Sequence, residues 1–191
     1  ADELARAVEV VATVGAGVGP PGNAAAVHAR FEGGLDPHRS GWAFNDDGAT
    51  VAPAPQRVAV MLQEGAPRTR SSTIRARLRA RRGASAGLVV GWLQEGAMVT
   101  VAADHRPGIW RLNVARRASG ASAWASTKIA QVPAPAGLAD PWFDLAVRFE
   151  PGAREIEVAI GDGPWRRLEL GAPLAEGRAG VNGFGLRDDG E

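Results

Sequence analysis

A pair of carboxylates in this chain has a spacing that suits acid–base chemistry. Glu155 and Glu157 lie two positions apart in "REIEVAI", residues 154–160. Alternate residues of a strand share a face at about 6.6–6.8 Å between Cα atoms, and inverting glycosidases hold two carboxyl groups about 6.5–9.5 Å apart. Any half-exposed strand produces the same pair as its solvated side, opposite apolar residues. Glu155 and Glu157 are therefore weak catalytic candidates, and whether the chain is an enzyme stays open, with the balance against it.

The aromatic residues offer a second kind of chemistry, the binding of a flat ligand. The chain has six tryptophans and no tyrosine. Exposed indole rings can stack on a sugar, although most tryptophans are large core residues with one N–H to satisfy. Alternation with Leu112 and Val114 places Trp110 in the core. Trp142 is out of phase with the apolar residues that follow it. The ligand-binding candidates are Trp124, Trp142 and Trp165.

Two acidic turns are weak metal candidates. Asp46 and Asp47 lie in "FNDDG", and Asp188 and Asp189 lie in "RDDGE". Calcium takes oxygen ligands of this kind from loops, but Asp-Asp-Gly is also an ordinary turn sequence. We expect no cofactor, with calcium as the alternative. The chain has no cysteine, which excludes disulfides and thiolate chemistry.

Basic residues are concentrated in the middle of the chain. Residues 65–128 carry 12 basic and 2 acidic side chains, whereas the segments on either side are acidic overall. Arg75, Arg77 and Arg79 share one face of an alternating segment, and they form a candidate interaction face for an acidic protein or a glycan. The alternative is a solvated face neutralised by neighbouring strands. Nucleic acid is not expected, because phosphate binding needs a cationic face without nearby acids.

Short alternating segments predict an all-β fold. In "STIRARLRA", residues 72–80, apolar and arginine side chains alternate strictly, as in a strand with one wet face. "REIEVAIGDGPWRRLEL", residues 154–170, is typical of a hairpin with Gly and Asp in its turn. Further strands are expected at 27–31, 57–63, 87–93, 98–103, 109–115, 122–132, 142–150 and 177–186. Turns every 8–12 residues or so are typical of an antiparallel sandwich or barrel.

The N-terminal part of the chain is expected to differ from the rest. Residues 1–23 are interpreted as an extension, or an added strand within 4–14, followed by a Gly/Pro-rich linker, and residues 24–191 as the β-sandwich domain. A start at Ala-Asp-Glu without methionine favours an exported protein, periplasmic or extracellular, although a trimmed fragment has the same start. No apolar run reaches the roughly 18 residues of a membrane span.

The order of motifs from 72 to 186 resembles the concanavalin A-like lectin/glucanase superfamily. The motifs are "STIRARLRA", "AGLVVGWL", "MVTVAADHRPGIWRLNVA", "WFDLAVRF", "EIEVAIGDGPWRRLEL" and "GRAGVNGFG". Their style is similar to the laminin G-like and 3-keto-disaccharide hydrolase-like branch. The resemblance implies a jelly-roll sandwich of two antiparallel sheets, and it adds weight to calcium at loop ends.

Two departures from the family pattern limit this resemblance. The Glu-x-Asp-x-x-Glu motif of the superfamily's glucanases is absent. The strand that usually follows "GRAGVNGFG" is either missing or lies beyond this fragment, which predicts an unpaired sheet edge there unless residues 4–14 take its place. We expect residues 4–14 or another protein to cover that edge.

These observations favour a non-catalytic, exported binding module, with a glycan as the first ligand. The first alternative is an accessory or interaction domain in a larger envelope assembly, with another protein as its partner. The second alternative is a glycoside-active hydrolase.

Overall fold

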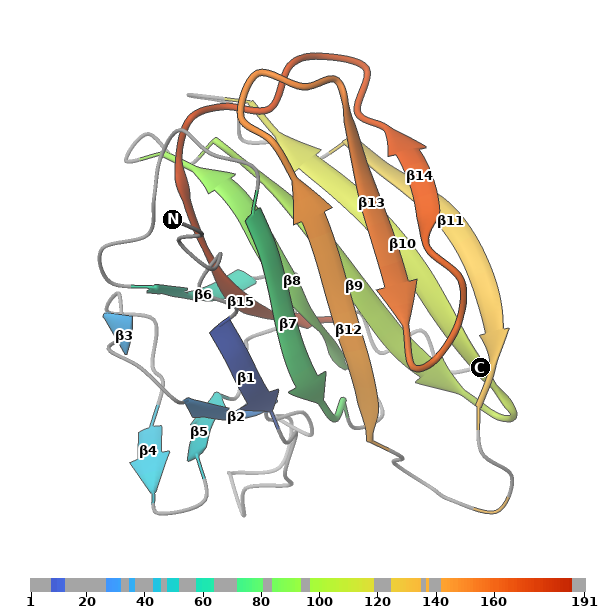
Figure 1. Ribbon diagram of the computed structural model, residues 1–191. Helices are drawn as coiled ribbons and strands as arrows, with labels where there is room; N and C mark the ends of the chain where they lie inside the picture. The colour runs from blue at the N-terminus through green and yellow to red at the C-terminus, as the bar shows by residue number, and fades with distance from the viewer. Residues whose placement is uncertain are drawn as a thin grey trace, which may run out of the picture.

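The computed structural model describes residues 8–12, 27–31, 35–36, 43–45, 48–51, 58–63, 72–80, 84–93, 97–118, 125–134, 137 and 142–186. These residues form a sandwich of two sheets (Figure 1). No helix occurs among them, and so none that could cross a membrane. The predicted all-β, antiparallel sandwich is confirmed.

The two sheets draw their strands from all parts of the chain. The eight-stranded sheet has the order β14-β13-β12-β7-β1-β2-β5-β4, with β1 Val8–Ala12, β2 Val27–Phe31, β4 Ala43–Asn45, β5 Gly48–Val51, β7 Ser72–Leu78, β12 Phe143–Phe149, β13 Glu155–Ile160 and β14 Arg166–Glu169. The seven-stranded sheet has the order β11-β10-β9-β8-β15-β6-β3, with β3 Leu35–Asp36, β6 Val58–Gln63, β8 Ala84–Trp92, β9 Met98–Arg106, β10 Ile109–Arg117, β11 Ala125–Pro133 and β15 Arg178–Gly185.

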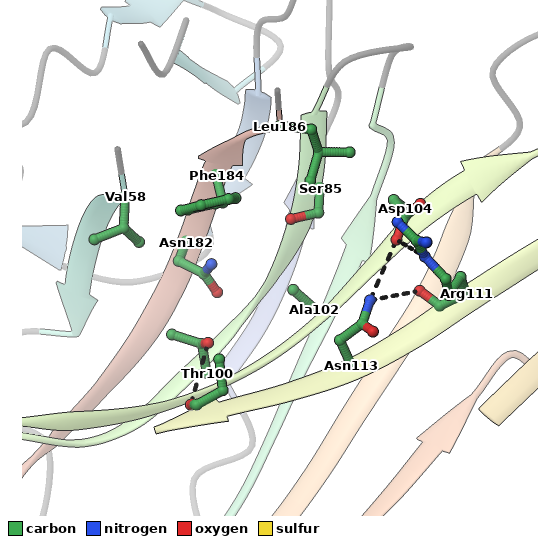
Figure 2. Close-up of a pocket in the computed structure, with 11 residues that line it drawn as sticks. Val58, Ser85, Thr100, Ala102, Asp104, Arg111, Asn113, Asn182, Phe184 and Leu186 are labelled. Atoms are coloured by element: carbon green, nitrogen blue, oxygen red, sulfur yellow. Dashed lines mark hydrogen bonds and ion pairs between the residues drawn. The ribbon is translucent and has the colours of Figure 1, made fainter. Parts of the chain in front are cut away.

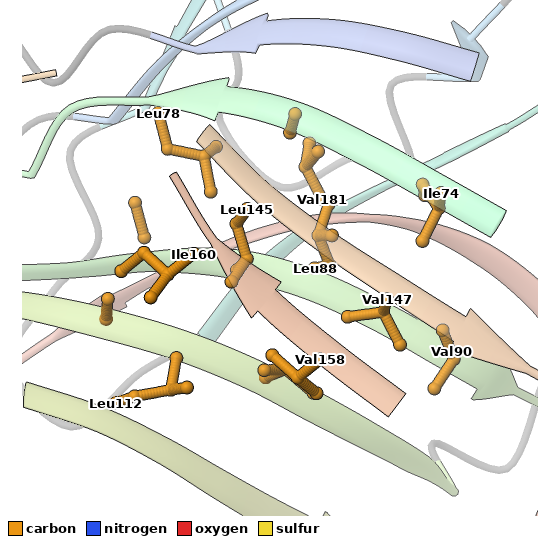
Figure 3. Packing of buried hydrophobic residues seen from close by; sticks show 14 of the residues in the cluster. Ile74, Leu78, Leu88, Val90, Leu112, Leu145, Val147, Val158, Ile160 and Val181 are labelled. Carbon is orange, nitrogen blue, oxygen red and sulfur yellow. The ribbon is translucent and has the colours of Figure 1, made fainter. Parts of the chain in front are cut away.

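Side chains on the facing sides of the two sheets make one apolar core. The eight-stranded sheet contributes the residues predicted from alternation: Ile74, Leu78, Leu145, Val147, Phe149, Ile156 and Val158. The seven-stranded sheet contributes Leu88, Val90, Leu112 and Val181 from β8, β10 and β15 (Figure 3). Trp110 is 3% exposed, as alternation predicted, and its ring centroid lies 4.5 Å from that of Phe143 on the opposite sheet.

The expectation of an open edge beside the C-terminal strand is wrong. β15 lies between β8 and β6, so both of its edges are hydrogen-bonded. The reason is that Val58–Gln63 takes the neighbouring position, with Met61 opposite Val181. The N-terminal strand β1 belongs to the other sheet, where it pairs in parallel with β7 and antiparallel with β2.

One arginine fastens the two sheets to each other. Arg116, near the end of β10, donates from Nη1 to the carbonyls of Leu170 at 3.2 Å and Ala172 at 2.7 Å, and from Nη2 to that of Pro173 at 2.9 Å. These carbonyls lie between β14 of one sheet and β15 of the other. Arg116 therefore satisfies three carbonyls of the connection between β14 and β15.

Truncating the core is expected to destabilise the protein strongly. Leu145→Ala should lower the free energy of unfolding by about 2–5 kcal/mol, because Leu145 has no exposed surface and the change leaves a cavity between the sheets. Urea unfolding measures the loss. Asp144→Ala, at the exposed position before it in β12, is the matched control and should change the free energy by less than about 0.5 kcal/mol. Equal unfolding midpoints for the two variants would contradict this packing.

Removing the hydrogen bonds of Arg116 to the connection between β14 and β15 should also lower the stability. Arg116→Ala should lower the free energy of unfolding by about 1–3 kcal/mol, since charged hydrogen bonds to three carbonyls are lost. Arg116→Lys should recover only part of this, because an ammonium group cannot reproduce the planar fork. Thermal unfolding, with exposed Arg154→Ala as control, tests the contribution of these hydrogen bonds. A lysine variant as stable as the wild type would show that the fork geometry is unimportant.

Candidate functional site

A polar pocket lies on the outer face of the seven-stranded sheet, the face turned away from the core. Its volume is about 340 Å³. Its polar lining comes from β8, β9, β10 and β15 and consists of Ser85, Thr100, Asp104, Arg111, Asn113 and Asn182 (Figure 2). Val58, Phe184 and Leu186 supply apolar lining. We call this cavity the polar pocket.

Strand alternation explains how these side chains meet. On β9, Thr100 and Asp104 point outward because Val101 and Ala103 between and beside them point into the core. On β10, Arg111 and Asn113 alternate with the core residue Leu112 in the same way. Cross-strand pairing then sets Arg111 opposite Asp104, so that neighbouring strands deliver complementary charges to one place.

The floor of the polar pocket is hollow because two small residues occupy its centre. Pairing across four strands gives the row Asn182, Gly87, Ala102 and Asn113. A Cβ atom on Gly87 would clash with the carbonyl oxygen of Val101 and lie 2.6 Å from Cα of Ala102. Glycine is therefore required at this position, and the two asparagines face each other across an open floor.

Asp104 is the centre of the charge network in the polar pocket. It is 1% exposed. Its Oδ2 accepts from Nε of Arg106 at 3.1 Å, and its Oδ1 accepts from Nε of Arg111 at 3.0 Å and Nδ2 of Asn113 at 3.2 Å. Two guanidinium groups thus balance one buried carboxylate. The bond through Nε leaves the terminal nitrogens of Arg111 without a hydrogen-bond partner among the described residues.

Asn182 carries an unmet hydrogen-bonding capacity. The residue is 1% exposed, and its Oδ1 has no hydrogen-bond partner among the described residues. Leaving a buried acceptor unsatisfied costs about 1–3 kcal/mol, so such groups are rare in folded proteins and call for an explanation. A ligand that donates a hydrogen bond into the polar pocket would satisfy it.

The residues predicted from the sequence lie on the other face of the molecule or outside the described residues. Glu155 and Glu157 are 48% and 36% exposed and are held in ion pairs, Glu155 with Arg167 at 3.6 Å and Glu157 with Arg148 at 3.6 Å. The two carboxylates therefore face arginines, and neither of them lines the polar pocket. Trp124 and the aspartates Asp46, Asp47, Asp188 and Asp189 lie outside the described residues. The described residues hold no group of three potential metal ligands.

The remaining candidates gather on the outer face of the eight-stranded sheet. Arg75, Arg77 and Trp165 line a second cavity together. Half-buried Trp142 contacts two cations, with the guanidinium carbons of Arg77 and Arg79 at 5.7 and 5.4 Å from its ring centroid. The Nε of Arg79 is buried without a hydrogen-bond partner. The predicted interaction face therefore lies beside two of the predicted ligand-binding residues, Trp142 and Trp165.

The polar pocket was not found from the sequence. Its signal was present, because polar residues interrupt otherwise apolar strands at alternate positions in "TVAAD", "RLN" and "GVN". Each polar residue alone fits the solvated side of a strand. The cross-strand register that collects them is visible only in the structure.

Comparison with known proteins relates the chain by its fold. No family model and no curated protein matches it. The carbohydrate-binding module CBM66 from Bacillus subtilis superposes with a TM-score of 0.57 at 14% identity, over 81% of this chain and 93% of the module. A mutant of the GH43 protein BlXynB from Bacillus licheniformis gives a TM-score of 0.33 at 11% identity, over 85% of this chain and 47% of that one. The chain therefore shares the two-sheet sandwich fold of the carbohydrate-binding module. Its place in the concanavalin A-like superfamily, and in a branch of it, stays a prediction.

The network around Asp104 should contribute to stability. Asp104→Ala should lower the free energy of unfolding by about 1–3 kcal/mol, because Arg106, Arg111 and Asn113 lose their shared acceptor. Asp104→Asn should cost less, since an amide oxygen can still accept one of these bonds. Urea unfolding measures both variants against Glu176→Ala, an exposed carboxylate. An alanine variant with the wild-type midpoint would show that the network adds nothing.

Proposed function

We propose that the protein is a binding module that holds a carbohydrate in the polar pocket, without cleaving it. The observation that carries the proposal is the unpartnered, buried oxygen of Asn182 beside the network of Asp104, Arg111 and Asn113. The fold shared with a carbohydrate-binding module is consistent with this function. A periplasmic or extracellular location is part of the proposal.

The chemistry of the polar pocket matches that of a sugar. A hydroxyl group both donates and accepts, so vicinal hydroxyls need acceptors and donors close together. Asn182 offers an acceptor, and the free terminal nitrogens of Arg111 offer donors whose bonds to oxygen are charge-assisted. Phe184 gives the polar pocket an aromatic side on which the C–H groups of a sugar ring can pack.

The size and rigidity of the polar pocket also favour a small polar ligand. A volume of 340 Å³ lies at the lower end of the range of about 300–1,000 Å³ for small-molecule sites. The polar side chains of the lining project from hydrogen-bonded strands and not from loops, which lowers the entropy lost on binding.

Replacing Asn182 should separate binding from stability. Asn182→Leu should weaken binding at the polar pocket by at least about tenfold, or ~1.4 kcal/mol, because the acceptor oxygen of Asn182 is lost. The same change should leave the melting temperature unchanged or raise it, since it removes a buried, unsatisfied oxygen. A damaged fold would lower both the affinity and the melting temperature, so the two measurements together distinguish a binding role from a structural one.

Affinity electrophoresis in gels containing β-glucan, arabinoxylan, galactomannan, fructan or polygalacturonate identifies the ligand, and calorimetry with that polysaccharide measures the affinity. Arg166→Ala, an exposed residue that lines neither cavity, is the control. Failure of the wild type to bind any of these polysaccharides would overturn the proposal. Wild-type affinity together with wild-type stoichiometry in Asn182→Leu would remove the polar pocket as the site.

A further inference from the structure

A second cavity lies on the outer face of the eight-stranded sheet, and it shares no residue with the polar pocket. Its volume is about 590 Å³. The charged and aromatic residues of its lining are Arg75, Arg77, Asp144, Asp162 and Trp165. We call it the Arg–Trp cavity.

Small residues make the floor of the Arg–Trp cavity, as they do in the polar pocket. Arg75 of β7 pairs with Ala146 of β12, which pairs with Ala159 of β13. In the antiparallel pair of β13 and β14, Val158 is opposite Arg166. Trp165 precedes Arg166 and Ala159 follows Val158, so the indole lies at the far end of the row formed by Arg75, Ala146 and Ala159. Two methyl groups therefore separate a guanidinium group from an indole, and the space between them stays open.

The indole of Trp165 is held in place by its neighbours. The guanidinium carbon of Arg148 lies 3.8 Å from the ring centroid, within the range of a cation–π contact. Arg148 is held in turn by Glu157, which also faces Arg167 at 3.9 Å. An aromatic ring fixed in this way loses little conformational freedom when it binds a ligand.

The charged groups of the Arg–Trp cavity remain available for a ligand. Within the described part of the chain, no ion pair involves Arg75, Arg77, Asp144 or Asp162. Arg77 and Asp144 are opposite each other in register and still form no ion pair. Nearby Glu155 and Glu157 are occupied by Arg167 and Arg148. Two cations and two anions without an ion-pair partner among the described residues thus surround one cavity beside an indole, and Arg77 also contacts the ring of Trp142 at 5.7 Å.

We propose that the Arg–Trp cavity is a second saccharide-binding site, so that the module is bivalent. The combination of donors, acceptors and an aromatic ring suits hydroxyl groups and the apolar face of a sugar, whereas a purely anionic ligand would face Asp144 and Asp162. The two cavities lie on the outer faces of opposite sheets, so they bind separate polysaccharide segments and bridge them. This inference rests on the proposed function.

Agglutination of coated beads tests bivalency directly. Latex beads carry the polysaccharide that the electrophoresis panel selects, and the protein is the full chain. Wild type should agglutinate the beads. Trp165→Ala and Asn182→Leu should each still bind them, with about half the calorimetric stoichiometry, and neither should agglutinate. Trp165→Phe should retain part of the bridging because a ring remains. Arg166→Ala, in the same hairpin as Trp165 but outside the cavity lining, should behave as wild type.

Each other outcome overturns the inference in a recognisable way. If wild type binds beads without agglutinating them and Trp165→Ala binds equally well, there is no second site and the proposed function stands. If Trp165→Ala still agglutinates, the bridging comes from self-association. If Trp165→Ala abolishes all binding while its melting temperature is unchanged, the Arg–Trp cavity is the single site and the polar pocket loses its role. If wild type binds no polysaccharide, the proposed function fails first, and a protein partner for the Arg–Trp cavity becomes the alternative.

Discussion

The register between β8 and β9 is the constraint on which both the core and the polar pocket depend. Gly87 lies opposite Ala102, and Leu88 lies opposite Val101. Side chains alternate between the two faces of a sheet, so a shift of the register by one residue exchanges the faces. Such a shift would turn Leu88 away from the core, or would put a neighbour of Asp104 where Asp104 now lines the polar pocket. Gly87 secures this register, because its Cα hydrogen fits against the backbone at Val101 where a methyl group would not. The same pairing that buries the core therefore also opens the floor of the polar pocket.

The polar pocket also shows how a proposed binding site can cost stability. A sheet face turned to solvent is ordinarily covered by mixed polar side chains that water satisfies, whereas Asp104 and Asn182 are almost fully buried. Asp104 is compensated by two arginines and an asparagine, and the oxygen of Asn182 is not compensated within the described residues. The apolar alternative at this position would fold at least as well. An unsatisfied polar group in a rigid strand is thus better explained by ligand binding than by folding.

The sequence predicted the fold more completely than it predicted the site, and the reason is the range of the interactions. Alternation is local, so the strands around Ile74, Leu145 and Ile156 and their core faces could be inferred segment by segment. The polar pocket joins residues from Ser85 to Asn182, and its assembly depends on which strands are neighbours. The wrong expectation of an open edge at β15 has the same origin, because nothing in "GRAGVNGFG" indicates that β6 pairs with it. Neighbour order and register are not encoded in any one segment.

The concentration of arginine in the middle of the chain illustrates the same limit for charge. Counted as composition, residues 65–128 suggest a cationic surface. In the structure, Arg116 is bound by three carbonyls, Arg111 shares the carboxylate of Asp104, and Arg79 lies against Trp142. These cations have separate partners on different faces of the sandwich, so these three do not form one continuous cationic patch. Arg75 and Arg77 differ from them, since both line a cavity without an ion-pair partner among the described residues, although Arg77 also contacts the ring of Trp142. It is the local partner of each arginine, and not the net charge of the segment, that distinguishes a structural cation from one available for a ligand.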